Sequence, residues 1–196
     1  MLERSLDNCL TKVKNILSVI ICVFWVIIAL FYGVNMVEKK HVYPLKYKQT
    51  VIRYAKQNEI ESALVFAVIK TESSFREKVV SKKGAVGLMQ ILPSTAEYVA
   101  KLLGEENFDL KDATTNIRYG CKYIRYLLDR FSVVKTAICA YNAGEGKVEK
   151  WLKDKKYSSD GVNLEYIPYK ETSEYLEKIE KSFIKYKKLY GKILDN

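Results

Sequence analysis

The chain has 196 residues, a length that fits one globular domain plus an appendage better than two domains. Apolar residues make up 48% and charged residues 29% of the sequence, a composition that excludes a disordered chain. The formal net charge of +10 at pH 7 favours a polyanionic partner: nucleic acid, anionic lipid headgroups or the anionic bacterial wall. Charge alone does not choose among these, because a solvated basic surface would give the same composition.

The N-terminal part contains one long apolar segment. Residues 16–34 read ILSVIICVFWVIIALFYGV, about 19 residues without a charge, close to the ~20 that cross a bilayer as a helix. A cleaved signal peptide would have a shorter apolar region and a small-x-small cleavage site, and no such site follows. We therefore predict a cytoplasmic N-terminus over 1–15, an uncleaved membrane anchor over 16–37 and a linker over 38–46. Both flanks are basic, so the positive-inside rule orients the anchor only weakly.

The remaining residues, 47–196, are predicted to form one all-α domain with minimal β structure. About 150 residues are enough to bury a hydrophobic core. Asn116 resembles an N-cap in this region, and Gly104 and Gly144 resemble helix ends. Apolar spacing and these boundary residues predict helices over about 51–58, 64–72, 93–104, 116–131, 133–143 and 172–190.

The cysteines and the single histidine do not form a pattern typical of a metal site. Cys9, Cys22, Cys121 and Cys139 form no CxxC pair, and His41 stands alone. We therefore expect no metal site. Cys121 and Cys139 each fall on an apolar helix face, where a buried thiol is the usual state, and the sequence leaves a disulfide between them open.

Glu72 is the first candidate catalytic residue. Val65, Val68 and Glu72 follow i, i+3, i+7 spacing, so the carboxyl continues the apolar stripe of a predicted helix. It also lies at the C-terminal end of that helix, where the negative end of the helix dipole, like apolar surroundings, raises a carboxyl pKa. A partly protonated glutamate is what a general acid for glycoside cleavage requires. A glutamate that merely ends an amphipathic helix and turns to solvent would show the same spacing.

Two further segments carry residues suited to sugar recognition. In residues 81–93, SKKGAVGLMQILP, two glycines three residues apart permit a tight turn before Gln90, whose amide both donates and accepts hydrogen bonds. In residues 140–144, AYNAG, Tyr141 and Asn142 place an aromatic ring beside an amide at a helix end. Each segment alone is a weak indication.

Taken together and in this order, the segments resemble the signature motifs of Slt-type lytic transglycosylases, lysozyme-like enzymes of bacteria and phages. A fourth match is a segment of Glu, Ile-Pro and Glu-Thr followed by a tyrosine. The matching segments are TESSF at 71–75, GAVGLMQILP at 84–93, AYNAG at 140–144, and EYIPYKET at 165–172 followed by Tyr175. The resemblance spans roughly residues 47–190 and implies a lysozyme-like transglycosylase fold behind the single membrane helix.

The resemblance also implies roles for individual residues. Glu72 would be the catalytic acid/base, and Tyr141 would position or polarise its carboxyl. Ser81 and Gln90 would contact the N-acetyl sugars. The full set of substrate-binding residues implied is Ser81, Met89, Gln90, Tyr141, Asn142, Glu165 and Tyr175, with Met89 lining the glycan groove and Glu165 supplying an acidic position in it. No metal and no cofactor is implied, and Lys82, Lys83 and Val86 receive no role.

The reaction implied is non-hydrolytic cleavage of the β-1,4 bond between N-acetylmuramic acid (MurNAc) and N-acetylglucosamine (GlcNAc), leaving 1,6-anhydro-MurNAc ends. One carboxylate then serves as acid and later as base, unlike ordinary glycosidases with two. A hydrolase of the same fold, as in goose-type lysozymes, would need a second carboxylate, for which Glu77 and Glu165 are the candidates. A different class of protein, a non-catalytic wall-binding module of a secretion or division apparatus, would not need an intact Glu72.

Peptidoglycan as the partner also predicts the location of the protein. Because the wall lies outside the cytoplasmic membrane, residues 16–34 would hold the chain in that membrane as a single-pass protein with the catalytic domain on the extracytoplasmic side. Nucleic acid is not an expected partner, and partners in wall-spanning or division machinery stay open, as does the biological setting.

Overall fold

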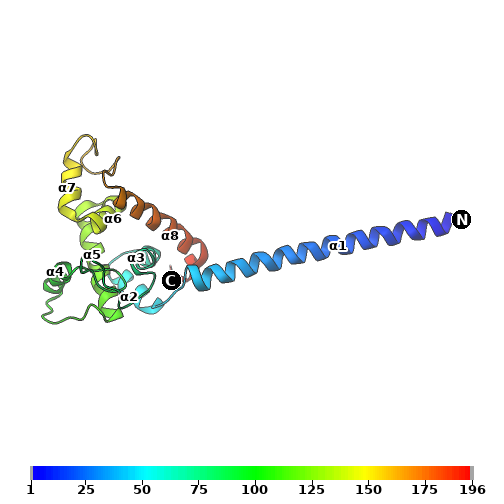
Figure 1. Cartoon of the computed structure of the whole chain (residues 1–196), viewed down its shortest axis with the longest axis horizontal. Helices are drawn as coiled ribbons and strands as arrows, with labels where there is room; N and C mark the ends of the chain where they lie inside the picture. Colours follow the sequence, from blue (N-terminus) through cyan, green and yellow to red (C-terminus); the bar gives the residue numbers. More distant parts are fainter. Residues whose placement is uncertain (1, 195–196) are drawn as a thin grey trace. The chain divides into compact units, whose positions relative to one another are not determined.

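The computed structural model describes the backbone of residues 2–194, and the side chains of residue 14, residues 17–34 and residues 36–194. The chain divides into two compact units, Met1–Pro44 and Leu45–Asn196. The first unit is drawn blue in Figure 1, and the second carries all later colours. Each unit is described by itself.

The N-terminal unit is almost entirely helical. Helix α1 (Leu2–Val37) is followed by a short π-helix, η1 (Glu38–Val42). The predicted anchor lies inside this long helix, which begins well before residue 16, and the predicted linker is helical in its first part. Residues Leu17–Val42 are long and apolar enough to cross a membrane, and none of that span is buried. Trp25 and Phe31, for example, are 62% and 66% exposed.

The second unit consists of seven helices within the described residues, joined by loops. No strand occurs among residues 45–194, where β structure is limited to two isolated bridges, Val80 with Val86 and Val86 with Ile91. The helices are α2 (Lys48–Gln57), α3 (Ser62–Ser73), α4 (Pro93–Leu103), α5 (Ala113–Phe131), α6 (Val134–Ala143), α7 (Glu145–Lys153) and α8 (Lys170–Leu194). The prediction of an all-α domain with minimal β structure is confirmed.

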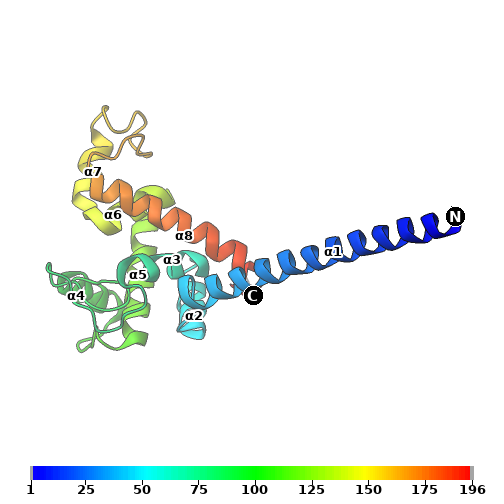
Figure 2. The same cartoon turned by 45° about the vertical axis from the view of Figure 1, so that its right-hand side comes forward.

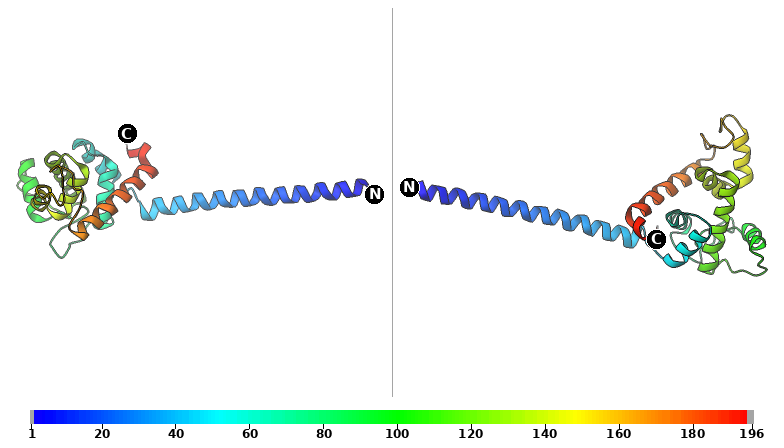
Figure 3. Two further views of the ribbon diagram at one scale, coloured as in Figure 1. Left: turned by 90° about the horizontal axis from the view of Figure 1, so that it is seen from above. Right: turned by 180° about the vertical axis from the view of Figure 1, so that it is seen from behind.

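Helix α3 is the centre of this unit. Every residue from Ser62 to Ile69 is buried, so the helix has no solvent face there. Helix α8 packs along α3 (Figures 2 and 3), and the ring of Phe66 stacks on that of Tyr186 at 5.2 Å. The described buried apolar side chains all fall between Val51 and Leu194. The hydrophobic core of this unit is therefore complete without the N-terminal helix.

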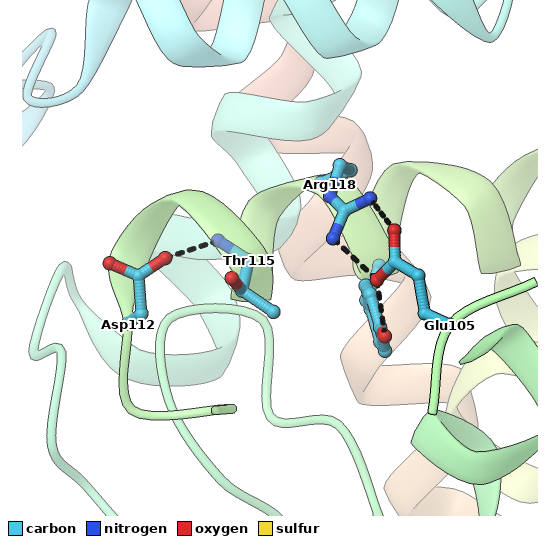
Figure 4. Close-up of polar contacts among 5 residues, drawn as sticks. Glu105, Asp112, Thr115 and Arg118 are labelled. Atoms are coloured by element: carbon cyan, nitrogen blue, oxygen red, sulfur yellow. Dashed lines mark hydrogen bonds and ion pairs between the residues drawn. The ribbon is translucent and has the colours of Figure 1, made fainter. Parts of the chain in front are cut away.

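The predicted N-cap of α5 is wrong by one helical turn. The cap is Asp112, whose carboxylate accepts from the Thr115 backbone N–H at 2.7 Å (Figure 4). Asn116 lies inside the first turn and is buried. Both residue types favour N-caps. Asp112 takes that place, while Asn116 bonds to a distant loop.

Two smaller differences concern α5 and the segment after α6. In α5 the apolar spacing of Ile117, Cys121, Ile124 and Leu128 predicts that Leu128 faces the core, but Leu127 is fully buried and Leu128 is only half-buried. Helix α7 was not predicted. Gly144, at φ 91°, ends α6 and begins α7 at the same residue, so two helices meet where the sequence indicates only a stop.

The thiols of Cys121 and Cys139 are free and buried, so the disulfide left open by the sequence is absent between them. Burial raises the pKa of both thiols, that of Cys139 to about 12. Cys9 lies outside the described side chains.

Candidate active site

Glu72 lies in the last turn of α3, as the sequence predicted. The helix ends there because Ser74 (φ 51°) and Phe75 (φ 62°) are both left-handed, which turns the chain sharply. Phe75 is buried beside Phe66, at 6.3 Å between ring centroids, and Arg76 Nε donates to the Ser73 carbonyl at 2.9 Å. A buried aromatic ring and a side-chain cap thus fix the turn that follows the candidate acid.

The carboxyl group of Glu72 is kept partly protonated near neutral pH. Burial raises its pKa from 4.5 to about 7, although the hydrogen bond from Tyr175 lowers it. Tyr175 Oη donates to Glu72 Oε1 at 2.7 Å. Within the described part of the chain, Glu72 forms no ion pair that would favour the carboxylate. Desolvation is therefore the larger of the two effects on the pKa of Glu72. A carboxyl that stays partly protonated near neutral pH can act as a general acid.

Two tyrosines, Tyr141 and Tyr175, lie close enough to Glu72 for its charge to affect their pKa values. Burial and then the charge of Glu72 raise the pKa of Tyr141 and of Tyr175 well above the usual value for a phenol. Tyr175 holds the carboxyl directly, whereas Tyr141 Oη donates to the Met89 carbonyl at 2.7 Å. Tyr141 thus connects the neighbourhood of Glu72 to the glycine-containing loop.

That loop, residues 79–92, is held by its own side chains. Gln90 Nε2 donates to the Gly87 carbonyl at 2.9 Å and to the Val79 carbonyl at 3.2 Å. Ser81 Oγ accepts from the Ala85 N–H at 3.0 Å. Both predicted sugar-contacting residues therefore also build the loop.

Asn116 fixes the loop to α5. Its Oδ1 accepts from the Met89 N–H at 2.8 Å, and its Nδ2 donates to the carbonyls of Val86 and Leu110, each at 2.9 Å. Gly87 has φ 82°, and a Cβ there would overlap Asn116. Glycine is thus required by both the backbone conformation and the close approach.

Beside Tyr141 lies an open cavity of about 570 Å³. Of the predicted site residues it is lined by Gln90, Tyr141 and Asn142. The other side chains that line it combine aromatic rings with charged and hydroxyl groups, a mixture suited to sugars and their substituents. Those not assigned a role from the sequence include Lys83, Tyr123, Glu145, Lys147, Tyr169, Glu171 and Thr172.

The remaining predicted residues lie elsewhere. The Met89 side chain is fully buried, where it packs on Gly120, so only its backbone reaches Tyr141 and the expected groove lining is not observed. Glu165 does not line the cavity; its Oε1 accepts hydrogen bonds from Ser159. Ser81 is likewise outside the lining, and Tyr175 is buried behind Glu72.

Sequence reasoning missed Asn116, Thr172 and Lys83. Thr172 Oγ1 donates to Asn142 Oδ1 at 2.9 Å and so orients a cavity amide, a role hinted at only by its place in the fourth motif. Lys83 Nζ lies 3.9 Å from Glu171 across the same cavity, and no local signal distinguishes it from other surface lysines.

Comparison with known proteins agrees with this geometry. A family model described as transglycosylase SLT domain matches residues 49–163, more than half of the chain. The chain therefore belongs to the transglycosylase SLT family. The soluble lytic murein transglycosylase of Salmonella typhimurium is 34% identical over 143 residues, which cover 70% of this chain and 22% of that protein. The membrane-bound lytic murein transglycosylase C of Haemophilus ducreyi is 32% identical over 166 residues, covering 72% of this chain and 45% of that protein.

Among solved structures, the 70 kDa soluble lytic transglycosylase of Escherichia coli is similar, with a TM-score of 0.66 and 30% identity over 74% of this chain and 25% of that one. The expected lysozyme-like fold is thereby confirmed. The chain spans less than half the length of each of these relatives.

Proposed function

We propose that this chain is a membrane-anchored peptidoglycan lytic transglycosylase, with Glu72 as its single acid/base. The observation that carries the proposal is the carboxyl of Glu72, whose pKa burial raises to about 7 and which accepts a hydrogen bond from Tyr175. Glu72 does not itself line the cavity of mixed polarity, but Tyr141, whose pKa the charge of Glu72 raises, does. The names of the relatives support the same class of reaction.

The reaction begins with proton transfer. Glu72 donates its proton to the oxygen that leaves as the GlcNAc 4-hydroxyl, while the C1–O bond of MurNAc breaks and the ring gains positive charge. The N-acetyl group of MurNAc assists as an internal nucleophile. Tyr175, already hydrogen-bonded to Glu72, stabilises the carboxylate that this step creates.

The second half of the reaction uses the same carboxylate as a base. Glu72 removes the proton from the MurNAc 6-hydroxyl, and O6 bonds to C1 as the bond between C1 and the acetamido oxygen breaks, which restores the N-acetyl group and closes the 1,6-anhydro ring. The proton count balances, because Glu72 ends as it began. An intramolecular hydroxyl has an entropic advantage over a captured water.

The cavity residues divide into two roles in this proposal. Gln90, Tyr141 and Asn142 contact the N-acetylated sugars, since their side chains line the cavity. Ser81, Met89 and Tyr175 support these contacts by holding the loop or the carboxyl, and Glu165 acts through the neighbouring loop at Ser159.

The hydrolytic alternative requires a carboxylate that activates water. Of the two candidates, Glu77 accepts a hydrogen bond from Tyr47 and Glu165 accepts from Ser159, and neither of them, like Glu72 itself, lines the cavity. Glu145 and Glu171 do line it. We favour the transglycosylase because, among the described acidic residues, only Glu72 has a pKa that burial raises to about 7.

The membrane location is part of the proposal. Its support is the apolar segment Leu17–Val42 and the name of the H. ducreyi relative, a membrane-bound enzyme. Because peptidoglycan lies outside the cytoplasmic membrane, the N-terminus is placed in the cytoplasm and the second unit on the extracytoplasmic side.

Digestion of purified sacculi tests the proposed reaction. We expect mass spectrometry of the soluble products to show 1,6-anhydro-MurNAc ends, lighter by one water than lysozyme products and without a reducing end. Glu72→Gln protein is the matched control and should release nothing. Reducing MurNAc as the dominant end from the earliest time would establish the hydrolase, and no release by the unaltered chain would favour a wall-binding module.

A further inference from the structure

The two halves of helix α8 differ in charge. The first half contains four glutamates, at positions 171, 174, 177 and 180. From Lys181 to Leu194 the helix contains five lysines and no acidic residue. Such a block of positive charge on an amphipathic helix is typical of a segment that contacts an anionic surface.

The lysines of this half gather on one face of the helix. Lys181, Lys185, Lys188 and Lys192 follow i, i+4, i+7, i+11 spacing and so share one side, which also includes Ile184. The opposite side is the buried one, with Ile179, Tyr186, Tyr190 and Leu194. We call the lysine-bearing side, from Lys181 to Lys192, the basic face of α8.

Ile184 is the unusual member of the basic face. Its side chain is 63% exposed, as high as that of several residues in the apolar span of α1. An isolated exposed aliphatic residue is common on protein surfaces. Here it stands among lysines, an arrangement in which an apolar side chain enters the headgroup region while the lysines contact phosphates.

Helix α2 lies beside the C-terminal end of α8. Ile52 and Lys56 of α2 line one hollow together with Leu194 of α8, and Lys48 precedes Ile52 by one turn. The hollow also contains Glu59 and Glu61. Helix α2 is the first helix after Leu45, where the second unit begins. Leu194 belongs to the buried side of α8, so this hollow lies beside the end of the helix and not on its basic face.

We propose that the basic face of α8 binds the headgroup region of an anionic phospholipid bilayer. A bilayer fits better than an anionic wall polymer, because only a bilayer offers an apolar layer for Ile184. Binding would keep the second unit close to the membrane surface. The inference deepens the membrane attachment proposed above, but it concerns a surface within residues 45–196 alone.

Vesicle flotation with residues 45–196, whose core is complete in itself, tests this surface without the anchor. We expect binding to vesicles of phosphatidylcholine and phosphatidylglycerol in equal amounts, and none to phosphatidylcholine alone. Lys181→Ala, Lys185→Ala and Lys188→Ala together should weaken binding about 100-fold, since each lysine near an anionic surface contributes about fivefold. Ile184→Ser should weaken it about tenfold through lost apolar burial.

The control carries the same net charge as the triple variant. Lys101→Ala, Lys150→Ala and Lys153→Ala remove three exposed lysines of α4 and α7, and binding should remain that of the unaltered protein. Equal weakening in both triple variants, or no binding to anionic vesicles, would overturn the proposal. An unchanged affinity of Ile184→Ser would also overturn it, because the surface would then fit any polyanion. Sacculus digestion by the same variants is measured without lipid, so a failure of the proposed catalysis is distinguished from a failure of membrane binding.

Discussion

Two glutamates in the second unit, Glu72 and Glu105, show how the same side chain acquires opposite properties. Glu105 receives two hydrogen bonds from the Arg118 guanidinium (Figure 4) and one from Tyr119, and Arg118 holds its pKa below the usual range. Glu72 is half-buried, accepts a hydrogen bond from one tyrosine and pairs with no cation among the described residues, and desolvation raises its pKa to about 7. Ion pairing makes a carboxylate structural, whereas burial without a cation makes a carboxyl able to donate a proton near neutral pH.

The largest expected effect is on the rate of sacculus digestion, which should differ between Glu72→Gln and Glu105→Gln. Glu72→Gln should lower the rate of sacculus digestion by about 10²–10⁴-fold, because the amide keeps the shape but donates no proton to the leaving oxygen. Glu105→Gln should leave the rate within a few fold, since Glu105 lies in an ion pair with Arg118 and its pKa is lowered, so it has no proton to donate near neutral pH. Turbidity loss of purified sacculi measures both. Comparable losses in the two variants would remove Glu72 from its role.

The stability of Glu72→Gln should depend on pH in a defined direction. The unfolded glutamate ionises above about pH 4.5, while the folded one stays neutral until about pH 7. The unaltered protein therefore loses stability as pH rises between these values, by up to about 3 kcal/mol, since each pKa unit corresponds to about 1.4 kcal/mol. Glu72→Gln should show no such loss, so its stability relative to the unaltered protein rises with pH. Urea unfolding at low and high pH measures this difference.

Tyr175→Phe tests how the hydrogen bond from Tyr175 affects the pKa of Glu72. The hydrogen bond from Tyr175 lowers the pKa of Glu72, so its removal raises that pKa further. The alkaline limb of kcat/KM should move to higher pH by about one unit, the size expected for one hydrogen bond to a charged group. A pH profile of kcat/KM on soluble glycan fragments measures the shift. A limb that stays in place or moves to lower pH would contradict the assigned electrostatics.

The smallest effect concerns the stability of Glu105→Gln. Breaking the bidentate pair with Arg118 should cost about 1 kcal/mol at neutral pH, because the pair is partly exposed. The pKa of Glu105 is lowered, so its contribution is present above the pKa of the unfolded state and is lost as pH falls. The sign is thus opposite to that of Glu72→Gln. Thermal unfolding at neutral and acidic pH checks the sign.

Sequence reasoning succeeded where local chemistry decides the outcome. The position of Glu72 at the end of a helix, the stop of α4 at Gly104 and the all-α fold follow from apolar spacing and boundary residues. It failed where a distant contact decides. Asn116 and Asp112 have similar N-cap preferences, and only the folded loop at Met89 and Val86 selects which one caps the helix.

The candidate site shows the same division. Gln90, Tyr141 and Asn142 stand in sequence motifs and line the cavity together. Lys83 and Glu145 line it as well, but only the fold brings a loop residue and the first residue of α7 to one place. Burial of Met89 against Gly120 was likewise not predictable, because it depends on how closely α5 approaches the loop.

Direct titration of Glu72 tests the central claim, that burial without a cation keeps this carboxyl protonated near neutral pH. NMR of protein labelled at the glutamate side-chain carboxyl carbons, with Glu72→Gln to assign the signal, follows its chemical shift as a function of pH. We expect a pKa of about 7 for Glu72, and a pKa below the usual glutamate range for Glu105. A pKa of Glu72 near the ordinary value of 4.5 would contradict it, because the group would then be ionised at neutral pH and would have no proton to donate.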